Sequence, residues 1–136
     1  MNREAIKEII PHREPMLLID GAEVEDNESV GKYTVRGDEW FLQGHFPDNP
    51  VVPGVILCEM MAQSACALLA NNSGVKATPY LTGLDKVRFK RSVFPKDEIV
   101  FTCKLAARRG GFYFIKGIGK VGGETCVSGE FSFKVV

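Results

Sequence analysis

The sequence predicts an α+β fold in which a curved antiparallel β-sheet wraps one long central helix. Residues 53–70 have the length of a helix and are apolar on almost every face, which is typical of a helix buried on all sides. Apolar and polar residues alternate in segments after this helix, which indicates strands. Short connections rich in turn residues join the strands and favour antiparallel pairing.

The composition is that of an ordinary globular protein. The chain has 136 residues, of which 45% are hydrophobic and 25% are charged. This length favours a single domain over residues 1–136. Lys and Arg together number 17, as do Asp and Glu, so the net charge is zero. The balance excludes a strongly basic nucleic-acid-binding protein and an acidic disordered chain, and we expect no nucleic-acid partner.

The cysteines predict buried free thiols rather than a disulfide framework or a metal site. Each lies in an apolar segment, and no two have the C-x-x-C spacing of zinc ligands: Cys58, Cys66, Cys103 and Cys126. Residues 1–7 hold no apolar signal segment, and polar residues interrupt the longest apolar stretch, 54–70. We therefore expect no metal, no membrane insertion and a cytoplasmic location.

The N-terminal part is predicted to form a short helix and two strands. Residues 3–10 can form the helix, with Asn2 as its N-cap. A polar turn at 26–29 separates strand candidates at 21–25 and 30–36. These elements precede the long helix.

A rigid loop is predicted to lead into the long helix. The loop, 43–54, contains three prolines, and such loops often hold functional groups in place. The helix, 53–70, begins with proline, which is favoured in a first turn, and turn-forming residues at 71–74 end it. The remainder is predicted to be about four strands, with glycine pairs at 110–111 and 122–123 marking hairpin turns.

Two polar residues on the long helix are candidates for function. Glu59 and Gln63 lie four residues apart, and therefore on one face. A buried carboxylate is costly without a partner. In a structural interpretation, Glu59 points to solvent or caps a backbone group, and Gln63 is a satisfied buried amide. His45, on the loop before the helix, favours an acid–base pair with Glu59 instead.

The start of the helix adds a candidate site for negative charge. Gly54 allows another group to come close to its backbone N–H. Free N–H groups and the helix dipole favour negative charge at this end. A base, an acid and an oxyanion site together suit proton abstraction next to a carbonyl.

Five segments form an ordered set of motifs along most of the chain. They are HREPMLLID at 12–20, FLQGHFP at 41–47, PVVPGV at 50–55, EMMAQ at 59–63 and LDKVRF at 84–89. This set resembles the 3-hydroxyacyl-[acyl-carrier-protein] dehydratases of type II fatty acid synthesis. The resemblance implies the hot-dog fold, in which an antiparallel sheet wraps a long helix. The chain departs from the pattern at Glu14, where an aromatic residue is usual, and at Ser92, where proline is common.

The resemblance implies removal of water from a (3R)-hydroxyacyl thioester to give the trans-2-enoyl thioester. His45 is the implied general base for the C2 proton, and Glu59 protonates or positions the departing C3 hydroxyl. The N–H of Gly54 stabilises the thioester oxygen. Gln63 orients the carboxyl group, and Phe46 adjoins the base. No cofactor is implied, because the substrate brings its own phosphopantetheine arm.

The resemblance also implies two partners. Lys86, Arg88 and Lys90 alternate along a predicted strand at 84–91 and are expected to share one face. They are either a docking patch for the acidic acyl carrier protein or a solvated strand face. Proteins of this family pair their sheets edge to edge as homodimers, alone or as trimers of dimers, with the active site at the seam.

Two alternative functions share this fold class. One is an acyl thioesterase, and the other is a module that binds acyl chains without turnover. Hot-dog thioesterases usually lack the combination of residues 44–47 with Glu59 and Gln63, which favours the dehydratase. Glu59 stands where the dehydratase–isomerase branch has Asp, which points to dehydration without isomerisation. Five aromatic residues are either walls of an acyl tunnel or ordinary core residues: Phe46, Phe89, Phe94, Phe131 and Phe133.

Overall fold

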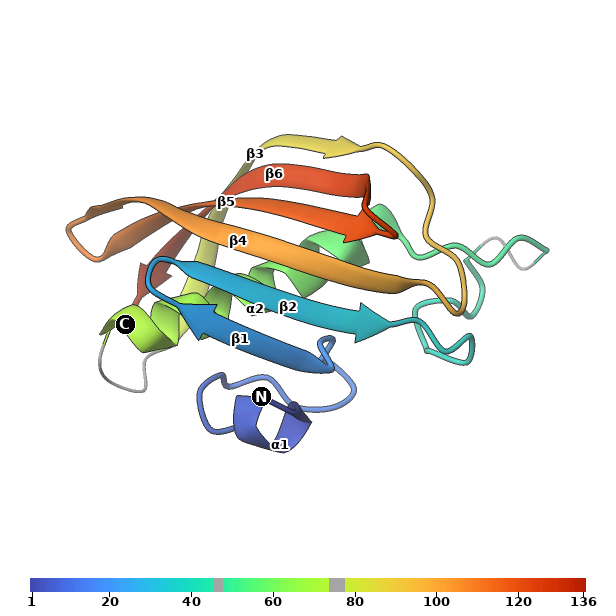
Figure 1. Ribbon diagram of the computed structural model, residues 1–136, viewed down its shortest axis with the longest axis horizontal. Coiled ribbons are helices and arrows are strands. Elements are labelled where there is room, and N and C mark those ends of the chain that lie inside the picture. Colours follow the sequence, from blue (N-terminus) through green and yellow to red (C-terminus); the bar gives the residue numbers. More distant parts are fainter. Residues whose placement is uncertain (46–47, 74–77) are drawn as a thin grey trace.

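A six-stranded antiparallel sheet curves around one long helix in the computed structural model, which describes residues 1–45, 48–73 and 78–136 (Figure 1). The strand order is β1-β2-β4-β5-β6-β3. The helices are α1 (Arg3–Ile6) and α2 (Gly54–Ser73), and the strands are β1 (Gly21–Glu25), β2 (Glu28–Thr34), β3 (Pro79–Phe89), β4 (Glu98–Arg109), β5 (Phe112–Val121) and β6 (Glu124–Val135). The predicted architecture is confirmed.

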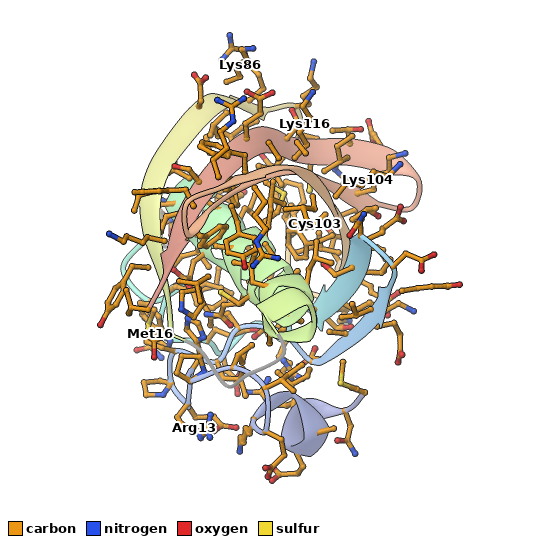
Figure 2. All side chains as sticks on the ribbon, turned by 90° about the vertical axis from the view of Figure 1, so that its left-hand side faces the viewer. Arg13, Met16, Lys86, Cys103, Lys104 and Lys116 are labelled. Carbon is orange, nitrogen blue, oxygen red and sulfur yellow. The ribbon has the colours of Figure 1, made fainter. Side chains whose placement is uncertain are left out.

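The long helix α2 is buried from Met60 to Leu69, whereas Val55 in its first turn is 76% exposed. Five residues of the buried part have no exposed surface: Met60, Met61, Ala65, Ala67 and Leu68. A helix that is apolar all round needs cover on all sides. Figure 2 shows the strands curving over α2. The segment at 12–20 also contacts the helix, through Met16 and Leu18.

Alternation along the strands separates the core face of the sheet from its outer face. In β5 buried and exposed residues alternate from Tyr113 to Val121, because successive side chains of a strand point to opposite faces. Figure 2 shows Cys103 on the side of the sheet that faces α2, and Lys104 and Lys116 directed outward. All four cysteines are buried free thiols, as predicted, and burial raises the pKa of Cys103 to about 12.

The strand β2 approaches α2 so closely that only glycine fits at position 31. A Cβ atom added to Gly31 would lie 1.9 Å from Ser64 Oγ. Ser29, on the same strand, donates a hydrogen bond to the carbonyl of Ser64 at 2.8 Å, and both serines are fully buried. This contact sets the position of the helix against the sheet.

Two boundaries in the N-terminal part differ from the predictions. Asn2 caps α1 as expected, by accepting a hydrogen bond from the N–H of Ala5 at 2.9 Å, but the helix ends at Ile6. The strand β2 begins at Glu28, because the hairpin turn before it has only two residues. The first of them, Asp26, adopts a φ of 52°, which the short polar side chain of Asp tolerates.

The strand β3 differs more from its prediction. It runs from Pro79 to Phe89 rather than over 84–91. Its register against β6 shifts just before Arg88, and Lys86 has a φ of 53°. The shift is a β-bulge, in which one strand holds an extra residue. Lys90 lies beyond the end of the strand, so its predicted place on the strand is wrong. The shared face of Lys86 and Arg88 stays a prediction.

The described residues include neither a helix fit to cross a membrane nor a cluster fit to hold a metal ion. Within residues 1–45, 48–73 and 78–136, no helix is long and apolar enough to cross a membrane. In the same part of the chain, no three His, Cys, Asp or Glu side chains gather closely enough to hold a metal ion.

Candidate active site

The segment between β2 and α2 is held by a carboxylate near its start. Glu39 accepts hydrogen bonds from the hydroxyl of Tyr33 at 2.7 Å and from the N–H groups of Arg36 at 2.8 Å and Gly37 at 2.7 Å. Partial burial alone would raise the pKa of Glu39, but these donors outweigh burial and lower it. The turn at 36–39 is therefore tied to β2, and it leads directly into the segment that carries His45.

The imidazole ring of His45 is oriented by the backbone of its own loop. Nδ1 lies 3.0 Å from the carbonyl oxygen of Val51. A carbonyl only accepts hydrogen bonds, so Nδ1 must carry a proton, and in the neutral ring Nε2 then carries the lone pair. This is the tautomer of a base that acts through Nε2.

His45 lines a pocket of about 630 Å³ at the N-terminus of α2. Gly54, the first residue of α2, lines the same pocket, and first-turn N–H groups have no partner within a helix. A Cβ atom at Gly54 would lie 2.9 Å from ring atoms of Phe89, so glycine allows this ring to pack against the helix start. Lys90 and Arg91 place positive charge on the wall. The structure thus brings His45 and Gly54 to one pocket.

Glu59 lies farther along α2 and is held by Gln63. The amide Nε2 of Gln63 donates to Glu59 Oε2 at 2.9 Å and to the carbonyl of Met16 at 2.7 Å, while its Oε1 accepts from the N–H of Leu18 at 2.8 Å. In the reversed orientation, the amide oxygen of Gln63 would face the carbonyl oxygen of Met16 and its NH₂ group would face the N–H of Leu18. The backbone at 16–18 therefore fixes the orientation of the Gln63 amide. Gln63 is fully buried. It is both a satisfied buried amide and the hydrogen-bond donor to Glu59.

A second ring lies beside Glu59. Nε2 of His12 is 3.7 Å from Glu59 Oε2, and the two side chains are 22% and 30% exposed. Burial lowers the pKa of His12, although the nearby carboxyl group of Glu59 opposes this effect. Sequence reasoning gave His12 no role. The motif at 12–20 contains it, but a contact between residues so far apart leaves no pattern along the chain.

The described part of one chain thus forms two groups of predicted site residues. His45 and Gly54 line the pocket, and Glu59 with Gln63 lies farther along α2. Glu59 is not among the described residues that line that pocket. Phe46, predicted to adjoin His45, lies outside the described residues.

The candidate tunnel aromatics divide into two kinds. Phe131 and Phe133 are core residues, with ring centroids 6.3 Å apart in an edge-to-face contact. Phe89 is 53% exposed and lines the pocket of His45, and Phe94 is 41% exposed. The core interpretation therefore holds for the first two, whereas Phe89 is a pocket wall.

Comparison with known proteins gives matches over nearly the whole chain. Residues 10–130 match the family model described as FabA-like domain. The 3-hydroxyacyl-[acyl-carrier-protein] dehydratase FabZ of Clostridium perfringens is 42% identical over 137 residues, covering 99% of both chains. The protein of the same name from Caldicellulosiruptor bescii is 43% identical over 137 residues, covering 98% of both.

Solved structures share the fold. The dehydratase heterocomplex ApeI:P from Xenorhabdus doucetiae has a TM-score of 0.83 at 22% identity, covering 95% of this chain and 89% of that chain. The E. coli PaaI protein has a TM-score of 0.67 at 14% identity, covering 82% and 79%. These likenesses concern the fold alone and confirm the predicted hot-dog domain. Because the family model spans residues 10–130 and its relatives align almost end to end, the chain belongs to the FabA-like family.

Proposed function

We propose that this protein removes water from (3R)-3-hydroxyacyl chains on acyl carrier protein and forms trans-2-enoyl thioesters in fatty acid synthesis. The observation that carries this proposal is the similarity of the whole chain to relatives named as 3-hydroxyacyl-[acyl-carrier-protein] dehydratases, at 42% identity over 99% of both chains. A thioesterase of the same fold is not favoured, because those full-length relatives are named as dehydratases.

The reaction needs a base at C2 and an acid at C3. His45 Nε2 takes the C2 proton, and the electrons of the C2–H bond form the C2=C3 double bond as the C3–O bond breaks. Glu59 gives a proton to the departing hydroxyl, which leaves as water. Each turnover moves one proton to His45 and takes one from Glu59. Return of a proton from the ring to the carboxylate restores the starting state.

Negative charge gathers on the thioester oxygen while the C2 proton leaves. The N–H of Gly54, in the first turn of α2, is our candidate donor to this oxygen, and the helix dipole adds to its effect. Phe89 shields one side of the pocket from water. Phe46, the neighbour of His45 in sequence, is proposed as a further wall.

We place the complete site at a seam between two copies of the chain. The strand β3 is an edge of the sheet, and Tyr80, Leu81, Leu84 and Phe89 on it are between 45% and 59% exposed. An exposed apolar edge strand is a template for pairing with another chain. A homodimer, alone or within a trimer of dimers, would let His45 of one chain act with Glu59 of the partner subunit.

The carrier protein is proposed to dock at the C-terminal end of β3. Lys86 and Arg88 lie there, and Lys90 follows on the wall of the pocket that holds His45. The Lys86 side chain is 71% exposed, and its pair with Glu130, at 3.7 Å, is a weak surface contact that an acidic partner can replace. Docking at this point leaves a short path for the phosphopantetheine arm.

Incubation with crotonyl thioester tests the function. Loss of the ultraviolet absorbance of the enoyl group by hydration supports a dehydratase working in reverse. Release of free thiol would indicate a thioesterase, and binding without either change would indicate a binding module. His45→Ala and Glu59→Gln are each expected to lower the rate by about 10²–10⁴-fold with unchanged circular dichroism.

Mixed refolding tests the shared site. His45→Ala and Glu59→Gln chains are unfolded together in equal amounts, refolded, and compared with each variant refolded alone. A mixed dimer with a shared site has one intact pair and one doubly altered pair, so about a quarter of wild-type activity should return. Near-zero recovery, with mixed dimers verified by mass tags, would show that each site belongs to one chain.

A further inference from the structure

The segment at 12–20 lies against the side of α2 that carries the proposed acid. Gln63 bonds to the backbone of Met16 and Leu18, and the ring of His12 lies beside Glu59. Figure 2 shows Arg13 and Met16 on the side of the molecule away from the outward-directed lysines of the sheet. This segment therefore contacts Glu59 and Gln63 from the side that the sheet leaves open.

Two nitrogens lie near the Glu59 carboxyl group, and both are close to the same oxygen. Within the described part of the chain, Gln63 Nε2 lies 2.9 Å from Oε2 and His12 Nε2 lies 3.7 Å from it. The second distance is longer than a hydrogen bond. Contacts in a substrate-free site are often long and tighten when substrate binds, so a small movement closes this gap.

The two nitrogens determine which oxygen can carry a proton. A protonated carboxyl group has one oxygen that donates and one that only accepts. The backbone fixes Gln63 so that its N–H faces Oε2, which makes Oε2 the accepting oxygen. The proton of the acid must then be on Oε1.

The ring of His12 is set up as a second donor to the same oxygen. Its Nδ1 is buried and has no hydrogen-bond partner among the described residues. The groups that affect its charge are Glu59, which favours the protonated ring, and burial and Arg13, which oppose it, with the neutral ring favoured overall. A neutral imidazole carries one ring N–H. If this N–H were at Nδ1 it would be a buried donor without a partner, whereas at Nε2 it faces the carboxyl group of Glu59, so the Nε2–H tautomer is favoured.

We propose that His12 is a positioning residue for Glu59, whose Nε2–H acts with Gln63 to keep Oε2 as the accepting oxygen and to turn Oε1, with its proton, toward the substrate. This inference rests on the proposed function, because it concerns the acid assigned there. It gives the side chain at position 12 a task that neither binds substrate nor transfers a proton.

Three substitutions at one position test the role of the Nε2 donor. His12→Phe keeps the ring and removes both nitrogens, so kcat should fall about 10-fold while KM changes less than twofold. His12→Gln places an amide N–H near the position of Nε2 and should restore kcat to within about threefold of wild type. His12→Asn is the matched control, because its shorter amide lies nearer the position of Nδ1 and should behave like His12→Phe.

A purely structural role predicts a different result. The thermal midpoint is measured for every variant, and kcat is expected to follow the donor at Nε2 rather than the midpoint. Wild-type kcat in His12→Phe would overturn the inference, as would equal kcat values in His12→Gln and His12→Asn.

A double variant tests whether His12 acts through Glu59. In the Glu59→Gln background, His12→Phe should cost less than about a further twofold, because the acid that His12 positions is already lost. A further 10-fold loss would overturn the inference. If Glu59→Gln alone keeps the wild-type rate, the proposed function fails as well. If Glu59→Gln loses its rate while His12→Phe does not, only the role of His12 is wrong.

Discussion

Replacing Gln63 by leucine should destabilise the fold as well as slow the reaction. Leucine has a similar volume but no polar atoms, so the N–H of Leu18, in a residue only 3% exposed, loses its acceptor. An unpaired buried N–H costs about 1–3 kcal/mol. The carbonyl of Met16 and the carboxyl group of Glu59 also lose a donor. Both groups are partly solvated, so losing this donor costs less free energy than losing the acceptor of a buried N–H.

The expected loss for Gln63→Leu is about 3 kcal/mol in the free energy of unfolding. For a chain of this size, that lowers the thermal midpoint by about 10 °C. Urea denaturation followed by circular dichroism measures the loss, and the turnover assay should show a lower kcat.

Ser64→Ala is the matched control for this substitution. Ser64 is the next residue on α2 and is also fully buried, but its hydroxyl donates only to the carbonyl of Met60 on the same helix, at 3.0 Å. Removing this hydroxyl leaves no N–H unpaired, so the loss should stay below about 1 kcal/mol. A loss for Gln63→Leu no larger than that of the control would refute the reasoning.

Three further predictions concern the pocket, the docking surface and pH. Gly54→Ala forces the ring of Phe89 to move and should lower kcat about 10-fold or more. The thermal midpoint should change little, because that ring is half exposed. An unchanged kcat would contradict this prediction. Lys86→Glu combined with Arg88→Glu should raise KM for carrier-linked substrate and leave turnover of a short thioester unchanged, whereas equal losses on both would point to misfolding. The pKa of His12 is lower in the folded chain than in the unfolded chain, so the unfolded state binds more protons as the pH falls below about 6.5, and the folded state should lose stability there. Urea midpoints at about pH 5.5 and pH 7.5 measure this loss. His12→Gln should make the difference between the two midpoints smaller.

The sequence predicted the elements whose environment is simple. The helix α2 is buried on all sides between Met60 and Leu69, so its run of apolar residues predicts a buried helix. In β4 the apolar residues Ile99, Phe101 and Cys103 are buried and alternate with more exposed neighbours, as the period of two in the sequence predicts. The edge strand β3 is exposed on most residues and contains a bulge, so no regular pattern marked its start. Patterns of apolar and polar residues reflect which side chains are buried, and few side chains of an edge strand are buried.

The candidate site was predictable in part for a similar reason. Glu59 and Gln63 are neighbours because a helix places residues four apart on one face, and the hydrogen bond between them follows from that spacing. The contact of His12 with Glu59 depends on how the segment at 12–20 crosses the helix. That crossing is a property of the folded chain, and no local rule gives it.

The close contact between Gly31 and Ser64 prevents α2 from rotating about its own axis. The serine hydroxyl lies where a Cβ atom of β2 would be, so the helix cannot roll or slide without closing on the strand backbone. Gln63, one residue earlier, fixes the same rotation from another direction through Met16 and Leu18. The aim of the Glu59 carboxyl group is thus set independently of the pocket walls. Substitutions that reshape those walls for a longer or shorter acyl chain can accumulate without turning the acid away from its target.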